Sequence, residues 1–256
     1  MSRFLTALLA GAALTGMASV ANATIITQQI TVGGGTPTVT TDLAAIAFNN
    51  AISLFNAGGI AAANPGFSLS FNSVTLMLNT QFNTNGTVRN NAAQAQNFQF
   101  DLKLDSYLGA GSQTNAAAAQ NKVTSYFGQF GTGDVQQDFG TQTYTGLGSG
   151  QTAGYPLAGS TTIQASPFET LTDATSLAAF TGTGNFSLNL NTSTAQTING
   201  GGGNITANLA TNAGGTFTVA YDYTLTQIPT GVPEPASMAL LGAGLLGAGL
   251  LRRRAK

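Results

Sequence analysis

Long runs of alternating apolar and polar residues constrain this chain more than any other feature of its sequence. In residues 216–225, Phe, Val, Tyr and Leu hold every second position and alternate with Thr, Ala and Asp. The same pattern occurs in four other runs: 26–32 (more weakly), 67–78, 98–105 and 186–190. Because successive side chains of a strand point to opposite faces of a sheet, each run predicts a strand with one buried face. In 67–78 the pattern changes phase at Asn72–Ser73, which predicts a β-bulge or a bend.

Short stretches rich in glycine and asparagine lie between and beside these runs. They are Gly33–Gly35, Asn85–Gly86, residues 199–204 and Gly214–Gly215. Both residue types favour turns, so we expect strands to end there. Several strands of this length joined by such turns are typical of an all-β fold. We predict an antiparallel β-sandwich, of the jelly-roll or immunoglobulin-like kind, over residues 24–230.

Three segments fit this pattern less well. Residues 42–56 suit a helix capped by Asp42 and ended before Gly58, but they also alternate as a strand would. Residues 115–122 favour a helix of one or two turns. Apolar residues thin out over 109–166, where we expect an insertion of long loops and short edge strands.

The composition excludes several classes of function. Only 7% of the 256 residues are charged, and the chain has no Cys, His or Trp. Too few Lys and Arg are present to neutralise the phosphates of a nucleic acid. Without His and Cys, the usual zinc, haem and iron–sulfur sites and His- or Cys-based catalytic triads are excluded. We therefore expect no cofactor and no obligate metal, and we predict that the protein is not an enzyme.

The N-terminal segment has the features of a signal peptide. Arg3 precedes the apolar residues 4–16, and the segment closes with Ala21–Asn22–Ala23. Small residues at the positions of Ala21 and Ala23 form an A-x-A site for signal peptidase. We predict that residues 1–23 are removed and that the exported chain begins at Thr24.

The C-terminal segment has the features of a short membrane anchor. Residues 236–251 are uncharged and are followed by Arg252, Arg253 and Arg254. As a helix these 16 residues would span about 24 Å, against a hydrocarbon core of about 30 Å. The arginines would stop transfer and stay in the cytoplasm, so the residues between the two segments would lie outside the inner membrane. Before the helix, Pro233–Glu234–Pro235 forms a stiff, extended stretch of backbone that suits the cleft of a processing enzyme.

The order of these C-terminal features resembles the PEP-CTERM sorting signal, here over residues 231–256. It consists of Pro233–Glu234–Pro235, a Gly/Leu-rich helix and a terminal Arg cluster. The resemblance implies processing by an exosortase, a membrane-embedded cysteine transpeptidase, in a bacterium with two membranes that makes an exopolysaccharide. The mature protein would lose both ends, which leaves three basic and eight acidic residues and a net charge of −5.

The rest of the chain resembles the choice-of-anchor E β-domain found on many PEP-CTERM proteins. The residues that carry this resemblance are Thr41–Leu43, Ser73–Leu76, Phe180–Gly184 and Val219–Tyr223. That family is named for its anchor and not for an activity. The stretch 109–166 departs from the compact pattern that the resemblance implies.

Carboxylates are the remaining candidates for chemistry. Asp101 and Asp105 share the polar face of 98–105 and could act together in glycoside hydrolysis, although a solvated outer face is the preferred interpretation. Asp134 and Asp138 are faintly similar to glycine–aspartate calcium loops, for which an ordinary polar turn is preferred. Seven aromatic residues of the loop-rich stretch are expected to form a satellite cluster under the loops, or else to stack on sugars. They are Tyr107, Tyr126, Phe127, Phe130, Phe139, Tyr144 and Tyr155.

Three function classes follow. We predict a secreted, exosortase-processed protein of the cell surface or exopolysaccharide matrix, with a structural or adhesive role in biofilm. The first alternative is a carbohydrate-binding module for the exopolysaccharide. The second is a secreted glycan hydrolase that uses carboxylates alone.

Overall fold

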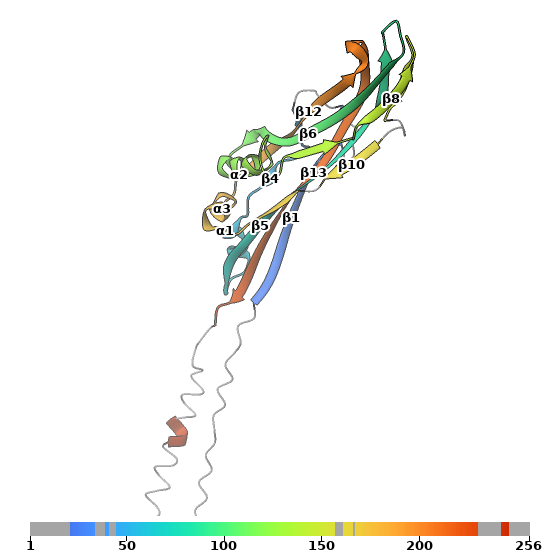
Figure 1. The fold of residues 1–256 in the computed structure, drawn as a ribbon. Helices are drawn as coiled ribbons and strands as arrows, with labels where there is room; N and C mark the ends of the chain where they lie inside the picture. The colour runs from blue at the N-terminus through green and yellow to red at the C-terminus, as the bar shows by residue number, and fades with distance from the viewer. Residues whose placement is uncertain are drawn as a thin grey trace, which may run out of the picture.

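The computed structural model describes residues 21–33, 39–40, 45–156, 161–165, 167–229 and 242–245. In this part of the chain, strands form one seven-stranded and one six-stranded antiparallel sheet, drawn in Figure 1 as an elongated, strongly twisted body. The buried apolar side chains of both sheets form a single core. The two sheets confirm the predicted all-β class.

Three long strands and four short ones make up the seven-stranded sheet. They are β1 (Ala21–Val32), β2 (Val39–Thr40), β5 (Phe67–Asn90), β9 (Thr152–Tyr155), β10 (Thr161–Ala165), β11 (Phe168–Leu171) and β13 (Ile205–Gln227). The six-stranded sheet consists of β3 (Ile46–Ala47), β4 (Ile52–Ser53), β6 (Gln96–Thr114), β7 (Val135–Asp138), β8 (Gln142–Leu147) and β12 (Asn185–Gly200). The long strands β5 and β13 pair along their whole length, as do most of β6 and β12.

The alternating runs coincide with the long strands, and their apolar residues face the core. Phe217, Val219 and Tyr221 of β13 are buried, while the residues between them are less so or face the other side. The predicted bulge is also present. The β5–β13 register shifts so that Asp222 lies opposite Ser73 and Tyr223 opposite Phe71, which leaves Asn72 as the extra residue.

Two of the predicted strand ends are wrong. Asn85–Gly86 lies inside β5 and Gly214–Gly215 inside β13, in continuous ladders. The glycines serve close packing rather than turns: a Cβ on Gly86 would lie 2.3 Å from the Asn208 backbone oxygen of the neighbouring strand. Residues 199–204 do form a turn between β12 and β13, with Gly200 to Gly203 all at positive φ in and beside the short 3₁₀ turn η2 (Gly201–Gly203).

The helices differ from the sequence expectation. The described part of 42–56 contains β3 and β4, and helix α1 (Ala57–Ala63) begins where the predicted helix was to end. The reason is its cap: Asn56 Oδ1 accepts the Gly59 N–H at 2.9 Å. Helix α2 (Ala117–Phe127) runs for 11 residues, longer than predicted, because Val123 and Phe127 add a buried face. Helix α3 (Ala174–Ala179) is capped by Asp173, and α2 lies beside β6 and β12.

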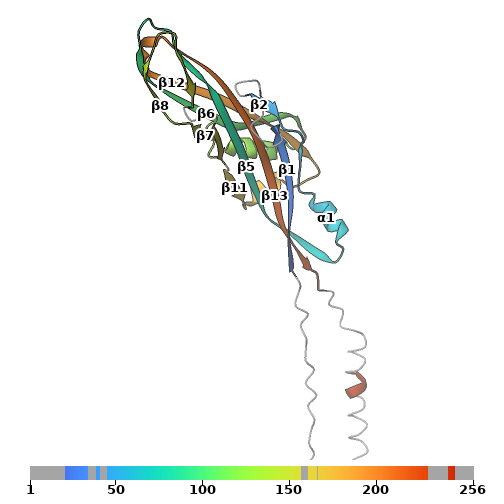
Figure 2. The same cartoon turned by 90° about the vertical axis from the view of Figure 1, so that its right-hand side faces the viewer.

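The sandwich has two distinct ends. At one end, here called the base, the first residue of β1, Ala21, lies opposite Thr226 near the end of β13. Figure 2 shows both strands reaching this end together. With 23 residues, β13 spans roughly 75 Å to the opposite end, here called the tip.

Asn90 ties the turns at the tip together. Its buried side-chain amide donates to the backbone oxygens of Gln94, Leu147 and Gly148, and its Oδ1 accepts the Ala92 N–H. A single buried side chain therefore joins several turns at the tip by hydrogen bonds.

Candidate functional site

The predicted signal-peptidase site lies at the start of β1, at the end of the sandwich where β13 also finishes. Ala21 and Ala23 lie exposed at the start of β1, opposite Thr226 and Thr224 of β13. Cleavage after Ala23 would remove three paired residues and leave nine residues of β1 in place. The sorting residues Pro233, Glu234 and Pro235 and the stop-transfer residues Arg252, Arg253 and Arg254 lie outside the described residues.

Most of the predicted membrane helix also lies outside them. Residues 242–245 are helical. The described part of the chain holds no helix with the length and apolarity that a membrane crossing requires.

The four candidate carboxylates meet on the outer face of β6 and β7, but in pairs that differ from those expected. Asp101 and Asp105 are four residues apart on β6, about 13 Å, which exceeds the separation that glycosidases use. In the β6–β7 register, Asp138 lies opposite Lys103 and diagonal to Asp101, and Asp134 continues the register diagonal to Asp105. The carboxyl groups therefore contact each other as Asp101–Asp138 and Asp105–Asp134.

These contacts perturb the acids in opposite directions. Burial raises the pKa of Asp105 to about 7, and the neighbouring Asp134 carboxyl adds to the shift. Burial and Asp138 also raise the pKa of Asp101. The Gly140 N–H, 2.7 Å from Asp138 Oδ1, lowers the pKa of Asp138, and Lys103 at 3.3 Å contributes to this.

In the Asp105–Asp134 contact, one oxygen of each carboxyl group lacks a hydrogen-bond donor among the described residues. Asp105 Oδ1 and Asp134 Oδ1 are both buried and accept no hydrogen bond within the described structure. The other oxygen of Asp134 accepts the Phe130 N–H at 3.1 Å. Two carboxyl groups in this arrangement are stable when they share a proton. Among the described residues, no group of three or more acidic side chains is arranged to hold a metal ion.

The spacing of the four aspartates in the sequence is a signal for this pairing. Asp134 and Asp138 have the same spacing as Asp101 and Asp105, so two antiparallel strands can align both pairs at once. Recognising it required knowing that β7 pairs with β6.

The satellite-cluster prediction for the aromatic residues is wrong for most of them. Tyr144, Tyr155 and Phe127 belong to the main core, where they contact Phe98, Phe100 and Phe217 respectively. They do so because β8, β9 and α2 pack directly on the sandwich. The Phe130 side chain is 88% exposed. Its backbone has a positive φ of 66°, and its N–H donates to Asp134 Oδ2, which supports this conformation.

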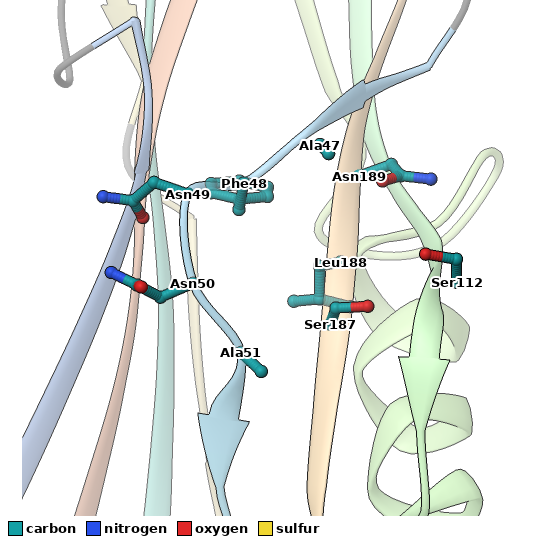
Figure 3. Close-up of a pocket in the computed structure, with 9 residues that line it drawn as sticks. All are labelled: Ala47, Phe48, Asn49, Asn50, Ala51, Ser112, Ser187, Leu188 and Asn189. Carbon is teal, nitrogen blue, oxygen red and sulfur yellow. The ribbon is translucent and has the colours of Figure 1, made fainter.

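A polar pocket of about 360 Å³ lies where residues 47–51 arch away from β12 (Figure 3). Figure 3 shows Asn49 and Asn50 pointing away from β12, and Asn49 Oδ1 accepts the Thr31 N–H of β1. Phe48 N–H donates to Leu188 O of β12, so this segment joins the two sheets along one edge. The pocket is lined by amide, hydroxyl and apolar groups and holds no titratable side chain, so it offers hydrogen bonding but no acid–base chemistry.

Comparisons with known proteins identify the C-terminal segment. Residues 231–254 match the PEP-CTERM protein-sorting motif. The match contains the predicted tripeptide and Arg cluster, and it marks an exported protein that passes through a membrane. The resemblance of the sandwich to choice-of-anchor E domains is not confirmed and stays a prediction.

The remaining comparisons add no functional information. No curated protein matches the chain. Among solved structures, a Macrobrachium rosenbergii nodavirus chain is 12% identical at a TM-score of 0.23, with 89% of this chain and 59% of that chain covered. An infectious bursal disease virus (Gx strain) chain is 13% identical at a TM-score of 0.21, with 82% and 37% covered. This chain thus spans 59% or less of those two chains, and such TM-scores carry no argument about its fold or function.

Proposed function

We propose that the protein is an exosortase substrate that is delivered to the cell surface or the exopolysaccharide matrix, where the sandwich has a structural or adhesive role. The observation that carries this proposal is the PEP-CTERM motif at residues 231–254, directly after the last strand of the domain. Signal peptidase and the exosortase would be its processing partners, and the inner membrane would hold it only until the second cleavage.

The arrangement of the strand ends supports this topology. β1 and β13 pair at one end of the sandwich, so the signal peptide and the sorting segment are attached at neighbouring points. Both hydrophobic segments can then enter the same membrane without unfolding the domain. Only five residues separate Gln227, the end of β13, from Pro233, so their Cα atoms lie at most about 22 Å apart. The processing enzyme would therefore work close to the base of the sandwich.

The shape of the domain supports a structural role. Strands β5 and β13 pair over roughly 75 Å, interrupted by the bulge at Asn72, so the domain can act as a spacer between its base and its tip. The tip is held by the Asn90 hydrogen bonds and would be presented away from the membrane. The Asp101–Asp105 separation gives a carboxylate-based hydrolase no comparable support.

The test is fractionation of two otherwise identical hosts, one with an exosortase and one without. In the first host, the protein should reach the surface or the medium without residues 236–256. In the second, it should remain at full C-terminal length in the inner membrane. Pro235→Ala, which relaxes the extended backbone, should reduce release, whereas Pro65→Ala, outside the motif, serves as the matched control. Equal release from both hosts would overturn the proposal.

A further inference from the structure

Residues 24–229 contain three basic side chains, and these differ in the charged groups that surround them. Lys103 forms an ion pair with Asp138. Lys122 lies near Glu169. Burial raises the pKa of Glu169, and the positive charge of Lys122 offsets part of this rise. Arg89 forms no ion pair with any residue that the structure describes, and its side chain is exposed. One guanidinium group is thus left without a counter-charge.

Arg89 lies on the outer face of the seven-stranded sheet, next to the tip. It is on β5, directly opposite Thr152 of β9 and Thr206 of β13. These residues line a groove of about 340 Å³ together with Thr87, Ala207 and Asn208. The groove therefore combines one cation with hydroxyl and amide groups at cross-strand distances of about 5 Å.

Gly154 keeps one side of this face open. It is paired with Thr87 in the β5–β9 register, two residues from Thr152 and on the same face of the sheet. A Cβ added at Gly154 would meet no atom within 4 Å. The space beside Thr87 is consequently free for a ligand.

We propose that this groove, called here the Arg89 groove, binds a polysaccharide that carries widely spaced carboxylate groups. Guanidinium groups bind carboxylates through two parallel hydrogen bonds, and hydroxyl and amide groups match the hydroxyls of the neighbouring sugars. A nucleic acid would need several cations, and a protein partner would need a large apolar residue at the centre of the contact. The groove has one cation and no apolar residue larger than Ala207. A densely charged polyanion would be repelled by the acidic surface of the mature chain, whereas sparse carboxylates would not.

This inference deepens the proposed matrix function and rests on it for the location of the domain outside the cell. The binding experiment does not use exosortase, so it can fail while sorting succeeds, and the reverse. The full chain, purified in detergent from a host without the enzyme, would be titrated with hyaluronan oligosaccharides, which carry a carboxylate on every second sugar. Dextran oligosaccharides provide the neutral probe, and oligogalacturonate, charged on every sugar, provides the densely charged one.

We expect binding of hyaluronan oligosaccharides, weaker binding of oligogalacturonate and no binding of dextran. Arg89→Gln should weaken hyaluronan binding about tenfold or more, the effect of losing one charge-assisted pair of hydrogen bonds. Gly154→Thr, which fills the open side without changing the charge, should also weaken it. Lys103→Gln removes the same charge from the other sheet and should leave affinity unchanged. Equal affinity in wild type and Arg89→Gln, an equal loss in Lys103→Gln, or no binding of hyaluronan would overturn the proposal.

Discussion

The contact between Asp105 and Asp134 predicts an unusual dependence of stability on pH. Because the pKa of Asp105 is raised from 3.8 to about 7 in the folded protein, the folded state holds a proton that the unfolded state has already lost between these values. The unfolded state then binds fewer protons, so the free energy of unfolding falls as pH rises from about 4 to about 7. Below that window Asp105 is protonated in both states, and its contribution to the free energy of unfolding is fully present. Above it, Asp105 is charged in both states and lowers the free energy of unfolding by a constant amount.

The size of the effect follows from the shift. A change of about three pH units corresponds to about 4 kcal/mol at about 1.4 kcal/mol per unit. The carboxyl group is only partly buried, so water lowers the cost of charging it in the folded protein, and we expect about 1–2 kcal/mol. Asp105→Asn removes the titration and supplies an amide donor for the unpaired Asp134 Oδ1.

The assay is urea unfolding of wild type and Asp105→Asn at several pH values from 4 to 8. The variant should match wild type near pH 4 and be about 1–2 kcal/mol more stable near pH 8. Asp222→Asn on β13 removes one acid from the other sheet and is the charge control. The reasoning is refuted if the gain of Asp105→Asn does not grow with pH, or if it does not exceed the gain of the control.

Two further predictions concern the tip and the packing of β5. Asn90→Ala should lower the free energy of unfolding by about 2–3 kcal/mol, because three backbone oxygens lose a donor. Asn91→Ala removes only an exposed hydrogen bond to Thr206 and should cost less than about 1 kcal/mol. Urea unfolding of both variants measures the difference, and equal costs would contradict the prediction. Gly86→Ala should lower the free energy of unfolding by about 1–3 kcal/mol, because the added Cβ would clash with Asn208 O. Gly154→Ala adds a Cβ in open space and should change stability by less than about 0.5 kcal/mol. A thermal melt that ranks the two variants in the opposite order would refute the packing argument.

The strand pattern was readable because it depends on local geometry. Phe217, Val219 and Tyr221 alternate with smaller or polar residues whatever their partners are, and so they reveal a strand with one buried face. The bulge at Asn72 was readable for the same reason, since a phase change is a local event. The C-terminal signal was readable because its three parts are contiguous in the chain.

Features that depend on a partner strand could not be read in this way. Gly86 resembles a turn residue until Asn208 of β13 is known to lie against it. The pairing of Asp105 with Asp134 depends on the β6–β7 register, and the exposure of Arg89 beside Thr152 depends on the β5–β9 register. The sequence pattern places Asn56 at the end of a predicted helix, although the same side chain is a favourable cap for the start of one.

Intact-mass analysis of the protein recovered from the cell surface of an exosortase-containing host tests the central claim most directly. The account predicts one chain that begins at Thr24 and lacks residues 236–256, with cleavage near Pro233–Glu234–Pro235. A surface protein that still carries Arg252, Arg253 and Arg254 would contradict it, because the sorting segment would then be an ordinary anchor and not a substrate for processing.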